Sequence, residues 1–192
     1  MKIILASQSP RRRELLSLMG VDFEVMPSDT EEDMKQKCSV AKLSEILSEQ
    51  KAKDIFDKTS GNRVVIGSDC MVYADNKIYG KPKNDDDAKQ MLKTLSGNWH
   101  KVVTGLCVFV ERDGIITKYR THDITKVKFV TLDNTMIDNY LKTGEHKDKA
   151  GAYAVQGYSG VFVEKLSGNY STVIGIPTHK LFKILHEENL VW

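Results

Sequence analysis

The sequence predicts an α/β fold with a mixed β-sheet, in one domain over residues 1–192. The first half of the chain alternates between short apolar runs typical of strands and longer stretches of helical periodicity. From His100 onward, long extended segments follow one another around a short polar turn, which favours antiparallel strands. A chain of 192 residues is long enough to bury a sizeable core as a single domain, with room for two lobes. Early alternation and later antiparallel strands together indicate a sheet with both strand orientations.

The N-terminal segment predicts a strand, a polar loop and a helix. Residues 3–5 form a short apolar run that breaks at Ser7. Ser9 suits the N-cap, and Pro10 suits the first helical position because its missing N–H would have no partner there. Gly20 stands where a helix C-terminal stop belongs.

The next elements follow from the same kinds of signal. Residues 23–26 predict a short strand, and Ser39 precedes a long amphipathic helix that ends near Gly61. The β-branched run 64–66 is typical of a buried strand, which we expect to end at residues 67–69. The remaining predictions are a hairpin of strands 71–73 and 77–79, a helix opened by Asn84, an antiparallel pair 102–110 and 115–129, a helix from Thr131 or Asp133 to Gly144, strands 152–156 and 161–166, and a helix from near Pro177.

Composition narrows the class of protein. The hydrophobic share of 41% and the charged share of 28% are those of a soluble globular chain. A formal charge of +2 argues against a nucleic-acid-coating protein, so any phosphate site must use locally placed charge. The three cysteines have neither disulfide nor zinc spacing, and no stretch reaches the length of a signal peptide or a membrane span. We therefore expect a cytoplasmic protein without nucleic-acid or membrane partners.

Three arginines, residues 11–13, stand at the start of the first predicted helix. A helix N-terminus attracts anions through its free N–H groups and dipole, and guanidinium groups add forked donors that match phosphate oxygens. Because successive helical residues turn by about 100°, the three side chains cannot all face one ligand. One or two of them are expected to bind an anion, and the alternative is an ordinary solvated helix surface.

Acidic side chains provide candidate metal ligands and bases. Asp69 follows the predicted strand 64–66, at the carboxyl end where α/β sheets place ligand crevices. Its carboxylate could hold a divalent metal or accept a proton from water, or simply cap a turn. Glu31 and Glu32 are adjacent acids in a polar loop, and they matter only if the fold brings one of them near Asp69. Mg²⁺ commonly takes one or two carboxylates together with substrate phosphate oxygens.

Two lysines are candidate phosphate ligands. Lys51 interrupts an apolar stripe in which Leu43, Leu47 and Ile55 recur at four-residue steps. It either extends its ammonium to the edge of the core or reaches into an anion site. Lys81 lies before a proline, which restricts its backbone.

The segment 148–157 mixes small residues with isolated polar ones. Its glycines permit close backbone approach to a ligand, and Gln156 offers both a donor and an acceptor, as reading a base edge requires. An ordinary loop and strand is the alternative. The sequence contains no Walker A motif, GxGxxG fingerprint, nucleophile elbow or zinc motif. Phosphoryl chemistry here would use another scaffold.

The chain resembles the Maf family of nucleoside triphosphate pyrophosphatases from Leu5 to about Leu185. The order and spacing of many short motifs carry the resemblance. These motifs are Ser7–Leu16, Glu31-Glu32, Glu49–Ala52, Gly67-Ser68-Asp69, Gly80-Lys81-Pro82, Leu95-Ser96-Gly97, Thr104-Gly105, Thr143-Gly144-Glu145, Asp148–Gly157, Gly168-Asn169-Tyr170 and Val173–Pro177.

The resemblance implies an elongated α/β fold with a deep substrate cleft between two lobes, similar in shape to inosine triphosphate pyrophosphatases. It implies hydrolysis of a nucleoside triphosphate between the α and β phosphates with a divalent cation, Mg²⁺ or Mn²⁺. The roles that it implies are a general base for Asp69, metal binding for Glu32 with Glu31 and for Asp69 itself, and triphosphate binding for Ser7, Arg12, Lys51 and Lys81.

Two segments of the resemblance concern the nucleobase. The branch of the family that acts on dTTP and UTP has Arg-Arg after Ser-Pro and an Ile- or Val-Gln-Gly segment, and this chain has Arg11, Arg12 and Gln156 at those places. Cys70 departs from the Thr usual in that branch, with a side chain of similar size and weaker hydrogen bonding. The alternatives are a pyrophosphatase for 7-methyl-GTP or another modified nucleotide and a non-catalytic regulator of septum formation. The sequence leaves a homodimer open.

Overall fold

The computed structural model describes residues 1–31 and 36–192. These residues form two compact units. The first unit comprises residues 1–69, 104–123 and 175–192, and the second comprises residues 70–103 and 124–174. Because each unit is compact by itself, the single domain expected from the chain length stays a prediction. Within the described residues, no helix has both the length and the apolar character needed to cross a membrane.

One seven-stranded sheet carries the helices of both units. The strands are β1 (Lys2–Leu5), β2 (Glu24–Val25), β3 (Arg63–Ala74), β4 (Lys77–Tyr79), β5 (Trp99–Arg112), β6 (Ile115–Phe129) and β7 (Val163–Ser167). The α-helices are α1 (Pro10–Ser17), α2 (Val40–Asp57), α3 (Asp85–Leu95), α4 (Asn134–Lys142), α5 (Tyr170–Ile174) and α6 (Thr178–Glu187). Three short 3₁₀ helices are η1 (Glu145–Asp148), η2 (Ala150–Ala152) and η3 (Tyr158–Phe162).

The sheet is mixed, as the sequence predicts. Its strand order is β2-β1-β3-β5-β6-β7, with β4 paired to β3 beside this path. β1 runs parallel to β2 and β3, whereas β4 is antiparallel to β3 and β7 is antiparallel to β6. The predicted α/β class with a mixed sheet is therefore confirmed.

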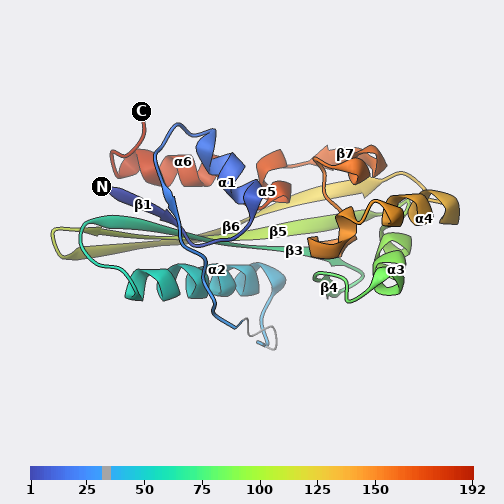
Figure 1. Ribbon diagram of the computed structural model, residues 1–192, viewed down its shortest axis with the longest axis horizontal. Coiled ribbons are helices and arrows are strands. Elements are labelled where there is room, and N and C mark those ends of the chain that lie inside the picture. The colour runs from blue at the N-terminus through green and yellow to red at the C-terminus, as the bar shows by residue number, and fades with distance from the viewer. Residues whose placement is uncertain (32–35) are drawn as a thin grey trace. The chain divides into compact units, whose positions relative to one another are not determined.

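Helices cover both faces of the sheet in the first unit. α2 lies on one face, and α1 and α6 lie on the other (Figure 1). An apolar core packs beneath them, since the strands carry continuous runs of buried apolar residues, such as 3–5 in β1 and 64–66 in β3. One cluster of this core consists of Ile4, Ala6, Ala52, Ile55, Phe56, Val65, Cys107 and Phe109.

Two glycines let α2 approach the sheet unusually closely. A Cβ placed on Gly67 in β3 would lie 2.3 Å from the backbone oxygen of Ser48, and one placed on Gly105 in β5 would lie 2.0 Å from that of Ser44. Both serines are fully buried on the face of α2 that meets the strands. Small residues on both sides therefore bring helix backbone against strand backbone, and they fix the height of α2 above the sheet.

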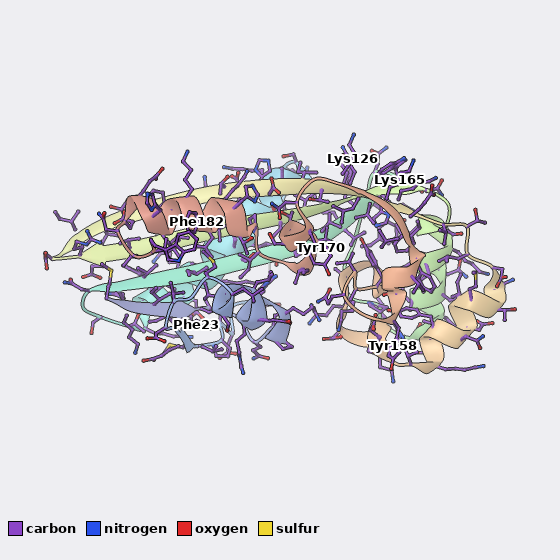
Figure 2. The ribbon with its side chains drawn as sticks, turned by 90° about the horizontal axis from the view of Figure 1, so that it is seen from above. Phe23, Lys126, Tyr158, Lys165, Tyr170 and Phe182 are labelled. Atoms are coloured by element: carbon purple, nitrogen blue, oxygen red, sulfur yellow. The ribbon has the colours of Figure 1, made fainter. Side chains whose placement is uncertain are left out.

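The second unit is built on α3 and α4, which pack against each other. Its apolar core includes Leu92 and Leu95 of α3 and Ile137 and Tyr140 of α4. The opposite side of its strands carries exposed lysines, of which Lys126 on β6 and Lys165 on the neighbouring β7 are labelled in Figure 2.

Local signals predict most elements correctly. The side chains of Ser39 and Asn84 cap α2 and α3, and Asp133, one of the two predicted starts, caps α4. The hairpin of β3 and β4 turns through Asp75 and Asn76, both at positive φ. Ser9 occupies the predicted N-cap position of α1, but its side chain makes no capping hydrogen bond.

One predicted strand end and one predicted strand are wrong. The strand expected to end at residues 67–69 continues to Ala74, because Gly67 and Ser68 pack inside the sheet instead of forming a turn. The segment 152–156 is not a strand, because Gly151 and Ala152 both have positive φ and turn the chain. The second predicted strand of this pair begins later than expected, as β7, after the 3₁₀ helix η3.

Candidate active site

β1 ends before the neighbouring strand β3 does. Leu5 pairs with Ile66, and the amide of Ala6 donates to the Ile66 carbonyl at 2.8 Å. β3 continues for eight residues beyond Ile66, whereas β1 ends at Leu5. Asp69 therefore lies inside β3, not after its end as the sequence predicts, and the strand end beside it belongs to β1. The strand end that the sequence places at Asp69 is therefore that of the neighbouring β1.

Lys51 reaches Asp69 through an ion pair. Its Nζ lies 2.5 Å from Oδ1 of Asp69, and the two side chains retain only 16% and 8% of their exposure. α2 supplies the lysine and β3 the aspartate, at the level where Gly67 lets the helix approach the strand. The sequence leaves open whether Lys51 extends to solvent or enters an anion site. The structure turns its ammonium inward, to a carboxylate.

A second polar cluster joins α1, β3 and the segment before α6. The Nε of Arg12 donates to the carbonyl of Gly175 at 3.1 Å, and its Nη1 donates to Oγ of Ser7 at 3.2 Å. The fully buried Ser68 places its Oγ 2.7 Å from the same Gly175 carbonyl and 2.8 Å from the carbonyl of Gly105. Its single hydroxyl proton can serve one of these oxygens at a time.

A side chain at position 175 would strain the backbone. The φ of Gly175, +127°, belongs to a region that other residues rarely adopt, and a Cβ there would lie 3.2 Å from Nε of Arg12. Ser68 and Gly175 both fall within motifs of the resemblance, but sequence reasoning assigns neither of them a role. Their partners are far away in the chain, so no local pattern could have found these contacts.

The two clusters lie on either side of β3. Ser68 and Asp69 are consecutive strand residues, so their side chains project to opposite faces of the sheet. Ser7 and Arg12 belong to the Ser68 face, and Lys51 belongs to the Asp69 face. The structure thus brings four predicted site residues to the same stretch of β3, as two groups instead of one.

Of the arginines 11–13, one is committed to this cluster. Arg12 holds Gly175 and Ser7, whereas Arg13 is exposed and Arg11 is half-buried. This agrees with the expectation that the three side chains cannot share one ligand.

Three predicted site residues belong to the second unit. Lys81 is exposed in the loop after β4, which is held by a 3.0 Å hydrogen bond from the Gly151 amide to the Gly80 carbonyl. Gln156 is exposed in a turn, and Cys70 is half-buried, with its Sγ 4.0 Å from the carbonyl of Thr172. Their roles in substrate binding stay predictions.

The acidic side chains that the structure describes supply only part of a site for a divalent cation. Glu31 is exposed, and Glu32 lies outside the described residues. Within residues 1–31 and 36–192, no group of three or more His, Cys, Asp or Glu side chains is placed to hold a metal ion. Asp69 nevertheless offers a hard carboxylate oxygen beside the ammonium of Lys51. That chemistry fits Mg²⁺ or Mn²⁺, which use one or two carboxylates plus substrate oxygens more often than a complete protein cage.

Lys51→Met is expected to destabilise the protein. The sequence alone favours no loss, because methionine suits an apolar stripe, but the ion pair reverses this expectation. Removing the ammonium leaves the buried Asp69 carboxylate without its cation, at a cost of roughly 1–3 kcal/mol in the free energy of unfolding. Urea denaturation measures the change.

The exposed Lys53, also on α2, provides the matched control as Lys53→Met. The double variant Lys51→Met/Asp69→Asn removes both charges and should recover part of the lost stability. Equal stability of Lys51→Met and the wild type would contradict the ion pair.

Comparison with known proteins gives a consistent result along the whole chain. The family model described as Maf-like protein matches residues 2–188. The chain is 47% identical over 191 residues to a dTTP/UTP pyrophosphatase of Aquifex aeolicus (strain VF5), covering 100% of this chain and 97% of that protein. It is 47% identical over 186 residues to a dTTP/UTP pyrophosphatase of Alkaliphilus oremlandii (strain OhILAs), covering 96% and 94%.

A solved structure shares the fold at low sequence identity. A HAM1 protein from Coxiella burnetii aligns with a TM-score of 0.50 and 16% identity, over 97% of this chain and 99% of that one. This similarity concerns the arrangement of the elements alone.

Proposed function

The chain belongs to the family of Maf-like proteins, and from this membership we propose that it hydrolyses dTTP and UTP to the nucleoside monophosphate and pyrophosphate. The observation that carries the proposal is the Lys51–Asp69 pair, whose two side chains retain only 16% and 8% of their exposure. A carboxylate beside a cation is a combination that phosphoryl transfer to water can use, since the cation stabilises phosphate charge and the carboxylate serves a metal or a proton. A protein that only bound nucleotides would have no need of that carboxylate.

Arg12 and Lys51 are proposed to bind the phosphates. The guanidinium of Arg12 is held in place by Gly175 and Ser7, so its planar donors are oriented before substrate arrives. Lys51 is a point charge that can exchange its carboxylate partner for a phosphate oxygen. Lys81 is proposed as a third cation for the triphosphate.

Asp69 is proposed to hold the divalent metal, to accept a proton from the attacking water, or both. Lys51 pairs with Oδ1, and Oδ2 is the second acceptor of the same carboxylate. Mg²⁺ or Mn²⁺, bound with the help of Glu32 or Glu31, would neutralise phosphate charge and polarise a phosphoryl oxygen.

The pyrimidine preference is proposed to depend on Gln156, with Arg11 and Cys70 as further contacts. A glutamine amide can pair with both a carbonyl and the N3–H of uracil or thymine. A site that hydrogen-bonds its ligand in this way rejects bases that leave its polar groups unpaired.

The products distinguish this activity from other nucleotide hydrolysis. With Mg²⁺ or Mn²⁺, dTTP and UTP should yield pyrophosphate and dTMP or UMP in equal amounts, and EDTA should abolish the reaction. Anion-exchange chromatography of early time points identifies the first products. The appearance of dTDP and orthophosphate as the first products would refute the proposal, and preferential turnover of 7-methyl-GTP over dTTP and UTP would refute its specificity.

A further inference from the structure

The proposed base-reading residue sits on a small turn in the second unit. Gln156 occupies the third position of the turn 154–157, which is closed by a 3.2 Å hydrogen bond from the Gly157 amide to the Ala154 carbonyl. Gln156 itself is exposed. A four-residue turn with one closing hydrogen bond is weakly ordered by itself, so its shape must be fixed by what surrounds it.

The carboxylate of Glu145 accepts hydrogen bonds from the residues just after this turn. The amide of Tyr158 donates to Oε2 at 2.6 Å, and the amide of Ser159 lies 3.4 Å from Oε1. The hydroxyls of Ser159 and Tyr140 lie 2.9 Å and 3.2 Å from the same Oε1. Hydrogen bonds to a carboxylate are roughly twice as strong as those between neutral groups.

Ser159 links Glu145 to the other end of the turn, at Ala154. Its Oγ accepts from the Ala154 amide at 2.9 Å and lies 3.0 Å from the Ala154 carbonyl. Ser159 is fully buried, and the side chain of Tyr158 is exposed at the edge of the second unit (Figure 2). Both ends of the turn are thereby tied, directly or through Ser159, to one carboxylate.

Gly157 fits against the same group. A Cβ placed on Gly157 would lie 2.1 Å from Oε2 of Glu145. The backbone of Gly157 has φ −109°, which is open to most residues, so a side chain here would displace the carboxylate without straining the backbone.

We propose that Glu145 is a positioning residue that holds the turn 154–157 in the shape from which Gln156 reads the pyrimidine base. The inference rests on the proposed function. It gives a role to the Thr143-Gly144-Glu145 motif, which contributes no group to the phosphate chemistry. A preformed turn lowers the ordering cost when the base binds and limits the orientations open to the Gln156 amide.

Glu145→Gln tests this role with little change of shape. The amide nitrogen must replace one of two oxygens that accept backbone N–H donors, so either Tyr158 or Ser159 loses its acceptor. We expect faster hydrogen exchange of a peptide covering residues 153–160, measured by mass spectrometry. We also expect roughly a tenfold or larger rise in the KM for dTTP and UTP, and weaker discrimination against dATP, with kcat nearly unchanged.

Inorganic tripolyphosphate has no base, so its binding should not depend on the position of Gln156. It therefore distinguishes a loss of base recognition from general damage to the site. Its inhibition constant should stay the same in Glu145→Gln, and Glu164→Gln, an exposed acid on β7, is the matched control for both measurements. The inference would be overturned if Glu145→Gln weakened the binding of tripolyphosphate and of dTTP equally. It would also be overturned if the variant left hydrogen exchange unchanged. Wild-type protein inactive on dTTP and UTP would instead refute the proposed function, while the exchange measurement would still decide whether Glu145 holds the turn.

A double variant supplies an independent check. Gly157→Ala should raise the KM for dTTP several-fold in the wild type, because the methyl group meets the carboxylate. In the Glu145→Ala background, the same substitution should have little further effect. Equal effects in the two backgrounds would show that Gly157 is required for a reason other than contact with Glu145.

Discussion

Asp69→Asn is expected to lower kcat for dTTP and UTP by about 10²- to 10⁴-fold, the usual cost of losing a general base, and by more if the metal is lost as well. Asparagine keeps the volume of the side chain within β3 but can neither accept the proton as a carboxylate does nor neutralise Lys51. Steady-state kinetics at saturating nucleotide and metal measure the loss.

The same substitution also removes the charge of Asp69 from its ion pair with Lys51, so stability must be measured beside activity. The exposed Asp57, which pairs with Lys53 on the surface of α2, gives the control variant Asp57→Asn. A folded Asp69→Asn protein that retained more than about a tenth of wild-type turnover would exclude Asp69 as the base.

Gly105→Ala is expected to destabilise the protein by about 1–3 kcal/mol or more, because a methyl group must enter a tightly packed contact. Its Cβ would lie 2.0 Å from the backbone oxygen of Ser44 and 2.3 Å from the carbonyl carbon. Backbone atoms cannot rotate away as a flexible side chain can, so α2 itself must move. Chemical denaturation measures the change in the free energy of unfolding.

Gly80→Ala is the matched control, since nothing lies within 4 Å of a Cβ at that position. Movement of α2 should also displace Lys51 from Asp69, so Gly105→Ala should lose turnover as well as stability. A Gly105→Ala protein as stable as the Gly80→Ala protein would show that the helix does not pack on the strand as closely as described.

The sequence predicts elements well where the signal is local. Ser39 and Asn84 correctly predict the starts of helices. The side-chain oxygen of each accepts a hydrogen bond from the backbone N–H three residues later, and this capping contact does not depend on the rest of the fold. Asp75 and Asn76 announce a hairpin because they tolerate positive φ. Such capping and turn preferences are local, so they predict the elements of the folded protein well.

Prediction from sequence is wrong where residues that are typical of turns serve tertiary packing instead. Gly67 and Ser68 are typical turn residues, but here their small size lets α2 reach β3 and lets a hydroxyl bond inside the sheet. For the same reason Asp69 was expected just beyond a strand and lies within one. At Ala152, apolar residues suggested a strand, but a positive φ ends the extended conformation.

Some residues of the candidate site can be predicted from the sequence, and others cannot. Periodicity marks Lys51 as unusual because a charge interrupts an apolar stripe, and the structure supplies its partner. Ser68 and Gly175 could not be found, because their contacts with each other join residues 107 positions apart. The roles assigned to Lys81 and Gln156 come from family resemblance and stay predictions.

The shared carbonyl of Gly175 has a consequence for the order of folding. Arg12 and Gly175 are separated by 163 positions, so the contact that orients the guanidinium closes nearly the whole chain into one loop. Closing so long a loop is entropically costly and is favoured late, after strands and helices have brought its ends together. During synthesis, a nascent chain that has not yet extended past residue 175 carries Arg12 without this anchor. The fixed orientation of the Arg12 guanidinium should therefore arise as one of the last events of folding, well after the sheet has formed.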